Sequence, residues 1–265
     1  MDIPFSRWHP AIEKRRSRRY FDPNLPLAPE TLTALDRVCH QFAPFPHARS
    51  RLVTESGDSV FKGIIGSYGR IKNAPAFIAF IGKMDDPFIQ EQVGYTGEGI
   101  ILEATALGLS TCWVGGFFRA EIAASLAEVS DNERVLAVTP VGYARESESL
   151  QEKLMTGFAR SHNRVAISKL ARGLPREKWP DWVNPSLEAA RRAPSAANRQ
   201  PWGFDVQDDG ITVFVRTAGP EFNVSKRLDC GIAMLHLEVA ALDSGCKGKW
   251  EFLPSPQVAK FKTRS

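Results

Sequence analysis

The chain has 265 residues, and its 34 Lys and Arg against 30 Asp and Glu give a formal net charge of +4 at pH 7. Hydrophobic residues make up 43% and charged residues 24%, which is typical of a folded globular protein and argues against an intrinsically disordered one. The length suits one large domain or two small ones. The small positive charge gives only slight support for an anionic partner.

The cysteines indicate a reducing compartment and no metal site. Cys39, Cys112, Cys230 and Cys246 form no CxxC pair and have no ligand-like spacing with the histidines, so we expect buried free thiols. The first residues contain no apolar core of a signal peptide, and the most apolar segment, 100–118, is interrupted by Glu103. We therefore expect a cytoplasmic protein with no membrane span.

Apolar spacing and turn residues predict alternating helices and strands in the first half. The expected elements are a helix over 11–19, a helix over 29–42, a strand near 51–54, a strand over 76–81, a buried helix over 100–107, a strand over 108–116, a helix over 119–128 and a strand over 135–141.

In the second half, residues 145–184 are polar and punctuated by proline, which predicts a connector. Asn184 can cap a following helix, with Pro185 in its first position. Strands are expected from Phe204 and over 211–215, followed by an apolar helix over 232–242.

The order of helix, Ala-Pro loop, strand and apolar helix occurs twice. Leu102-Glu103-x-x-Ala106-Leu107 matches Leu237-Glu238-x-x-Ala241-Leu242 at a separation of 135 residues, and Ala43-Pro44 matches Ala193-Pro194 at 150. The repeat predicts two half-copies, 1–150 and 151–265, packed about a pseudo-twofold axis.

Basic residues gather at 14–19 and around 160–164. Such a cluster can be a solvated helix face with surface ion pairs, a nucleic-acid contact or an anion site. No aromatic-interleaved surface or nucleic-acid module accompanies it, so we expect no nucleic-acid partner. The loop 193–202 is likewise open to two interpretations, an ordinary Pro/Ser/Asn turn or a functional loop held by the scaffold.

Taken together, three stretches resemble the FMN-dependent nitroreductases, in the branch whose chain is internally duplicated as a fused pseudo-dimer. They are Arg15-Arg16-Ser17-Arg18-Arg19-Tyr20-Phe21, Val114-Gly115-Gly116-Phe117 and Ala193-Pro194-Ser195-x-x-Asn198-x-Gln200-Pro201-Trp202. The resemblance implies an α+β nitroreductase-like fold, with two half-copies whose antiparallel or mixed sheets are flanked by helices. It also implies FMN as cofactor, and two-electron transfer from NAD(P)H to a nitroaromatic, quinone or similar small acceptor.

The resemblance also implies the cofactor-binding residues. Arg15, Arg16, Ser17, His162 and Arg164 would hold the phosphate; Arg19 and Arg70 would place positive charge near the flavin N1; the backbone of Val114, Gly115 and Gly116 would face N5; Pro194, Ser195, Ala196 and Asn198 would line the ring edge and ribityl chain; and Ser67 completes the set. No side chain need act as acid, base or nucleophile, because the flavin supplies the chemistry. A monomeric pseudo-dimer and a homo-oligomer both remain open.

The first-half loop departs from the family pattern. It reads Ala43-Pro44-Phe45-Pro46-His47-Ala48, without the Ser and Asn of the second-half loop. One flavin site is therefore expected between the first half's basic segment and the second half's loop, and the reciprocal site, which would use 44–46 and 164–168, is expected to be empty. The altered residues also leave open a second hypothesis, a catalytically idle protein that binds a flavin or another small ligand.

Overall fold

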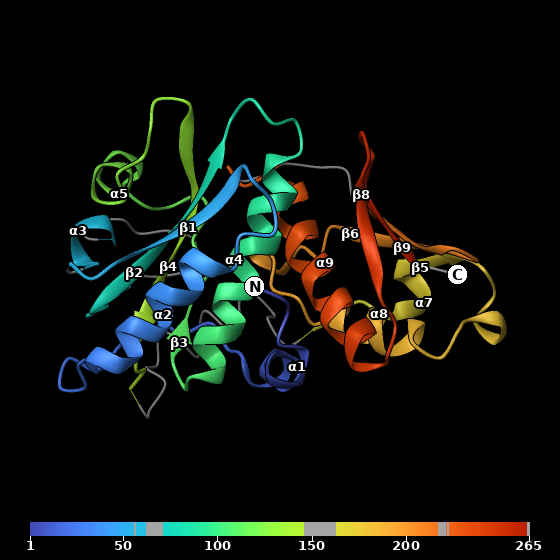
Figure 1. The fold of residues 1–265 in the computed structure, drawn as a ribbon, viewed down its shortest axis with the longest axis horizontal. Helices are drawn as coiled ribbons and strands as arrows, with labels where there is room; N and C mark the ends of the chain where they lie inside the picture. Colours follow the sequence, from blue (N-terminus) through green and yellow to red (C-terminus); the bar gives the residue numbers. More distant parts are fainter. Residues whose placement is uncertain (56, 62–70, 146–162, 217–220, 222, 264–265) are drawn as a thin grey trace.

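The computed structural model describes residues 1–55, 57–61, 71–145, 163–216, 221 and 223–263. Its elements form two groups along the chain (Figure 1). The first group is α1 (Phe5–Lys14), α2 (Pro29–Gln41), β1 (Ala48–Val53), α3 (Asp58–Phe61), β2 (Ala76–Lys83), α4 (Ile89–Ala106), β3 (Ser110–Thr111), α5 (Ala120–Leu126) and β4 (Glu133–Gly142). The second is α7 (Ile167–Leu170), β5 (Ala171–Gly173), η1 (Arg176–Lys178), α8 (Val183–Arg191), η2 (Ala196–Asn198), β6 (Trp202–Gln207), β7 (Gly210–Val215), α9 (Lys226–Asp243), β8 (Gly248–Phe252) and β9 (Gln257–Thr263).

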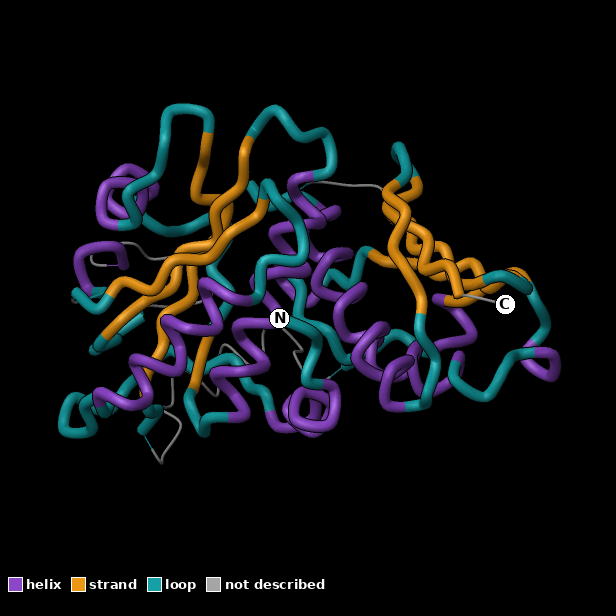
Figure 2. Tube along the Cα trace, in the orientation of Figure 1, coloured by secondary structure: helices purple, strands orange, loops and turns teal. Residues whose placement is uncertain are grey.

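Each group builds one sheet, and the two sheets share a strand order. The first is β1-β2-β4-β3, and the second is β5-β6-β7-β9-β8. All pairs are antiparallel except β5 with β6. The sequence of strands in β1-β2-β4-β3 therefore recurs as β6-β7-β9-β8, with β5 added at one edge. Figure 2 shows the two sheets on opposite sides of a central group of helices. The predicted α+β class is confirmed.

Helices α4 and α9 lie side by side between the sheets (Figure 1). A Cβ added to Gly94 would lie 2.1 Å from the carbonyl oxygen of Leu228, and one added to Gly231 would lie 2.0 Å from that of Glu91. The two backbones are thus in direct contact, which only glycine permits. When α4 is aligned with α9 by adding 137 to its residue numbers, Gly94 falls on Gly231 and Glu91 falls on Leu228, so the two contacts are equivalent.

The same shift of 137 relates both ends of α4 to those of α9. The Leu-Glu match, found at a separation of 135, is therefore two residues out of structural register, and its use as a marker of the repeat is wrong. Leu, Ala and Glu are common in helices, so such a match arises by composition. The Ala-Pro match has a separation of 150 residues, and this equals the separation between the last residue of α2, Gln41, and the last residue of α8, Arg191.

Strand β2 is buried on both faces, as its continuous apolar run predicts. Ile78 and Phe80 belong to the large core that also contains α4 and α9. Phe77, Ala79 and Ile81 point to the other face and pack with residues of α3 and α5. β2 pairs in turn with β4. Val138 of β4 forms a bridge with Val114, the first residue of the glycine segment 114–116.

Several predicted boundaries are wrong. The helix expected over 11–19 ends at Lys14, and the residues after it run extended, with a parallel bridge from Ser17 to Thr111. The strand expected over 108–116 is limited to β3. The expected connector 145–184 contains α7, β5 and η1, although its residues 146–162 lie outside the described part.

The predicted cap of α8 is also wrong. The cap position is Trp182, and the helix begins at Val183. The side chain of Asn184 instead accepts a hydrogen bond from Nη2 of Arg176 at 2.8 Å. Pro185 occupies the third helical position, where its missing N–H still breaks no helical hydrogen bond. Among the described residues, no helix combines the length and apolar content needed to cross a bilayer.

Candidate functional site

The basic segment after α1 lies beside the end of β3. The N–H of Arg18 donates to the carbonyl oxygen of Thr111 at 2.9 Å. Arg15 is only 8% exposed, and its Nη1 lies 3.4 Å from Oγ of Ser17. Burial lowers the pKa of the Arg15 guanidinium, and the nearby carboxylate of Glu98 opposes that shift. Since arginine keeps its proton at any physiological pH, this segment places a buried cation next to β3.

Arg164 brings a second cation to the same place from the other half of the chain. Its Nη1 donates to Oδ1 of Asn198 at 2.7 Å, and its Nη2 to the carbonyl oxygen of Arg192 at 3.2 Å. Burial, followed by repulsion from Arg15 and neighbouring arginines, lowers the pKa of Arg164 to about 10. The two basic segments therefore lie close enough together for their like charges to oppose each other.

Direct contacts join the two segments as well. Nη1 of Arg192 donates to Oε1 of Glu13 at 2.5 Å, and the carbonyl oxygen of Glu13 accepts from Nη1 of Arg16 at 2.6 Å. These bonds connect the end of α1 to the end of α8. The basic segment near the N-terminus and the loop after residue 190 thus lie on the same side of the molecule.

The loop after α8 is strained and firmly held. Ala197, Asn198 and Gln200 have φ of 53°, 52° and 44°, a region that non-glycine residues rarely adopt. The N–H of Gln200 donates to Oγ of Ser195 at 3.0 Å, and the side-chain amides of Asn198 and Gln200 each donate to the carbonyl oxygen of Asn163 at 3.0 Å. Strain of this kind persists only where surrounding contacts enforce it, and it gathers at functional sites.

The other end of the loop faces α9. The N–H of Ala196 donates to Oδ1 of Asp229 at 3.2 Å, and Nε of Arg199 to its Oδ2 at 2.7 Å. Nη2 of Arg199 also donates to the carbonyl oxygen of Val224 at 2.8 Å. Burial raises the pKa of Asp229 to about 6, although Arg199 opposes the shift. These contacts fix the segment that enters α9 against the loop.

The glycine segment meets that part of the second half. A Cβ added to Gly115 would lie 2.8 Å from Cγ2 of Val224. Val114 forms a bridge with Val138, in which each N–H donates to the other's carbonyl oxygen at 2.9 Å. Of the three backbone N–H groups expected to face the flavin, that of Val114 is therefore already engaged. Gly115 and Gly116 remain as candidates.

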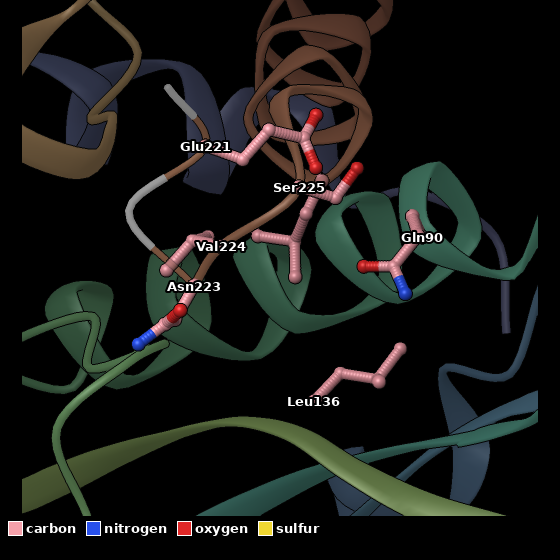
Figure 3. Close-up of a pocket in the computed structure, with 7 residues that line it drawn as sticks. Gln90, Leu136, Glu221, Asn223, Val224 and Ser225 are labelled. Carbon is pink, nitrogen blue, oxygen red and sulfur yellow. The ribbon is translucent and has the colours of Figure 1, made fainter.

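A cavity of about 450 Å³ opens beside this segment (Figure 3). Val224 belongs to both the cavity wall and the contact with Gly115. Figure 3 shows Gln90 reaching it from α4, Leu136 from β4, and four residues from the segment leading into α9. Its lining residues are Gln90, Leu136, Glu221, Asn223, Val224, Ser225 and Leu228.

The place expected for a reciprocal site, around the first-half loop 44–46, contains packed aromatic rings. Phe45, which corresponds to Ser195 at the 150-residue separation, lies with its ring centroid 5.2 Å from those of both Tyr95 and Phe252. The ring of Phe252 in turn stacks on Phe88 at 5.6 Å. The second-half loop has the short polar side chains of Ser195 and Asn198, whereas the first-half loop has the packed ring of Phe45.

The described structure brings ten of the predicted residues to one region: Arg15, Arg16, Ser17, Val114, Gly115, Gly116, Arg164, Ser195, Ala196 and Asn198. Pro194 is buried at the start of the loop, and the backbone of Arg19 accepts a hydrogen bond from Lys72. Ser67, Arg70 and His162 lie outside the described residues. No group of metal-ligating side chains occurs in the part of the chain that is described.

Sequence reasoning missed four charged or polar residues that frame this region, Glu98, Arg199, Asp229 and His236. Glu98 did carry a signal, because it is a carboxylate within an apolar, buried helix. The other three carried none, since their partners are far away in the sequence.

Comparison with known proteins agrees with this geometry. Residues 8–241 match the family described as "Putative TM nitroreductase", while a search of curated proteins finds no match. A "putative nitroreductase" from Thermotoga maritima has the same fold, with 20% identity, a TM-score of 0.59, and coverage of 96% of this chain and 93% of that one.

Two further structures are less similar. A nitroreductase family protein from Clostridium difficile has 21% identity and a TM-score of 0.47, with 64% of this chain and 98% of that chain covered. A nitroreductase with bound FMN from Bacteroides fragilis has 18% identity and a TM-score of 0.42, with 54% of this chain and 91% of that chain covered. On the family match, which spans most of its length, this chain belongs to the nitroreductase family described as "Putative TM nitroreductase".

Proposed function

We propose that this protein is an FMN-dependent oxidoreductase that transfers two electrons from NAD(P)H to a small acceptor such as a nitroaromatic or a quinone. The observation that carries the proposal is the meeting of Arg15, from the first half, with Arg164 and Asn198, from the second. Family membership supports the same activity.

The donor set fits the phosphate end of FMN. A buried guanidinium, that of Arg15, and a half-buried one, that of Arg164, would both be stabilised by an anion between them. Guanidinium is the group best suited to bind phosphate oxygens. Arg15 and Arg164 supply those cations, and Ser17 adds a hydroxyl 3.4 Å from Arg15. Asn198 already bonds Arg164, so we assign it to this end of the site rather than to the ring edge.

The glycine segment fits the ring end. Without a Cβ, Gly115 and Gly116 allow a flat ring to approach the backbone, and their N–H groups can donate to its edge. Bound FMN would supply the two-electron redox chemistry, and no side chain need act as acid or base. The loop 195–199 spans both ends, because Asn198 contacts Arg164 while Arg199 contacts Val224 beside Gly115.

We place the electron acceptor in the cavity of about 450 Å³ that borders Gly115 through Val224. Its wall combines apolar side chains with the amides of Gln90 and Asn223, a mixture typical of small-molecule sites. The cavity lies open to solvent, which can supply the protons that reduction of a nitro or quinone group consumes.

The aromatic packing of Phe45 and Phe252 on the reciprocal side supports one flavin per chain. The four cysteines in the structure are free thiols, which fits the reducing cytoplasm in which NAD(P)H is available.

The test is reconstitution of the purified chain with FMN, followed by NADPH oxidation in the presence of a nitroaromatic or quinone. We expect a yellow protein that consumes NADPH and whose Arg15→Ala and Asn198→Ala variants are folded but retain less flavin after purification. A yellow protein without turnover would instead support an idle flavin binder. Both variants retaining full flavin absorbance would contradict the site.

A further inference from the structure

A fully buried carboxylate connects the two ends of the proposed site. Glu98, on α4, is 0% exposed. Its Oε2 accepts a hydrogen bond from Nε1 of Trp113 at 2.6 Å. Its Oε1 lies 2.8 Å from Nε2 of His236 and 4.0 Å from Nε of Arg15. A buried charge is costly unless it is paired and hydrogen-bonded, and here every partner is itself part of the frame of the site.

The histidine ties this carboxylate to the second half. Nδ1 of His236 lies 3.1 Å from the carbonyl oxygen of Ala189. A carbonyl can only accept, so Nδ1 carries a proton. Nε2 of the same ring faces Oε1 of Glu98 at 2.8 Å, so the imidazole bridges the carbonyl of Ala189 and the carboxyl of Glu98. The pair thus anchors Glu98 to α8 and α9.

The other two partners belong to opposite ends of the flavin site. Trp113 directly precedes the Val114-Gly115-Gly116 segment. Arg15 is the buried cation of the phosphate end, and Glu98 faces its Nε side. That orientation leaves the Nη side free to face Ser17 and an anion.

We infer that Glu98 is a positioning residue, which holds the guanidinium of Arg15 towards the anion end of the site and fixes its distance from the glycine segment. The inference rests on the proposed function, because it concerns how FMN is held. Without this carboxylate, Arg15 would be a buried cation surrounded by other arginines, and it would turn out to solvent.

The variant Glu98→Gln removes the carboxylate and keeps a side chain of the same shape. Its amide oxygen can accept from Trp113, and its NH₂ can donate to a neutral His236 whose Nδ1 still donates to Ala189. The hydrogen-bond geometry is kept while the attraction for Arg15 is lost. We expect apoprotein carrying Glu98→Gln to bind FMN about ten-fold more weakly, and riboflavin, which has no phosphate, less than about two-fold more weakly. Quenching of flavin fluorescence measures both affinities.

Glu103→Gln is the matched control. Glu103 is also buried on α4 and also accepts from an indole, Nε1 of Trp8 at 2.8 Å, but its ion pair is with Arg7. We expect its ratio of FMN to riboflavin affinity to equal that of the wild type. In an Arg15→Ala background, Glu98→Gln should cause no further loss of FMN affinity, because its effect passes through Arg15.

Three results would overturn the inference while leaving the proposed function intact: FMN binding by Glu98→Gln that equals or exceeds the wild type, equal losses for FMN and riboflavin, or additive losses in the double variant. If Glu98→Gln does not fold, Glu98→Asp serves as the second variant, because its shorter side chain moves the carboxylate away from Arg15. It should weaken FMN binding more than riboflavin binding. A ratio of FMN to riboflavin affinity equal to that of the wild type would count against the inference. A wild-type chain that binds neither ligand would overturn the proposed function and the inference together.

Discussion

Nη1 of Arg164 donates to Oδ1 of Asn198 at 2.7 Å, across 34 residues of sequence. Asn198 has a φ of 52°, a left-handed conformation that asparagine adopts more readily than most residues. The guanidinium is thereby held beside Arg15, whose charge contributes to lowering the pKa of Arg164. The two basic segments, which lie far apart in the sequence, together make the anion site that we propose.

Asn198→Ala should weaken FMN binding by about ten-fold, because Arg164 loses the hydrogen bond that orients it. Riboflavin binding should change less. Titration of the apoprotein with both flavins measures the effect. Asn184→Ala is the matched control, since Asn184 also accepts from an arginine, Arg176 at 2.8 Å, on a different part of the second half. An equal loss in both variants would show that the effect is not specific to the site.

Phe45→Ala should lower the free energy of unfolding by about 1–2 kcal/mol, because it removes a half-buried ring from contact with Tyr95 and Phe252. The FMN affinity should not change, since the ring belongs to the reciprocal side. Urea unfolding and flavin titration measure the two quantities. Phe5→Ala, at a position 38% exposed, should cost less than about 0.5 kcal/mol. Loss of FMN binding by Phe45→Ala would place that ring in the flavin site and contradict the assignment.

Gly231→Ala should destabilise the protein by about 3 kcal/mol or more, since its Cβ would lie 2.0 Å from the carbonyl oxygen of Glu91 and must push α4 and α9 apart. Denaturant unfolding measures the loss. Gly108→Ala provides the comparison: its φ is +81° but its Cβ would meet nothing within 4 Å, so only conformational strain of about 1–2 kcal/mol applies. Equal costs at the two positions would mean that the helices are not in backbone contact.

The pairing of Glu133 with Arg49 predicts a pH dependence of stability. Two hydrogen bonds from Arg49, at 2.8 and 2.6 Å, are the main reason that the pKa of Glu133 falls from 4.5 to about 2. Because the folded-state pKa is the lower one, the stabilisation is fully present above pH 4.5 and is lost as the pH falls towards 2.

Without screening, the shift would correspond to about 3 kcal/mol. Because the Arg49 side chain is 38% exposed and solvent screens the pair, we expect about 1–2 kcal/mol. Glu133→Gln should therefore be less stable than the wild type by that order at pH 7, and the difference should shrink as the pH falls from 5 towards 2, as far as both chains stay folded. Unfolding curves at each pH measure the difference. A difference that stays constant across this range would exclude the ion pair as its source.

The fold class and the candidate site residues could be predicted from the sequence because the resemblance rests on three short stretches. These are Arg15–Ser17, Gly115–Gly116 and Ser195–Asn198, and each has its residue types in a fixed order. It could not give the geometry between them. The bond between Glu98 and His236 joins residues 138 apart in sequence, and no local pattern specifies that pairing.

Local signals also misled where tertiary contacts decide the outcome. Asn184 had the composition of a cap, yet its amide bonds Arg176 and the helix starts earlier. The Leu-Glu match suggested that α4 and α9 align at a separation of 135 residues. The contacts of Gly94 and Gly231 show that they align at 137. Helix propensity and short sequence matches are weak predictors of how two helices align where close backbone contact between the helices decides the alignment.

The most direct test of the central claim is the number of flavins that one full-length chain binds, measured by titrating the apoprotein with FMN and counting bound flavin by absorbance against protein concentration. The meeting of Arg15 with Arg164, and the rings packed on the opposite side, predict saturation at one FMN per chain. Saturation at two, or no binding at all, would contradict the account.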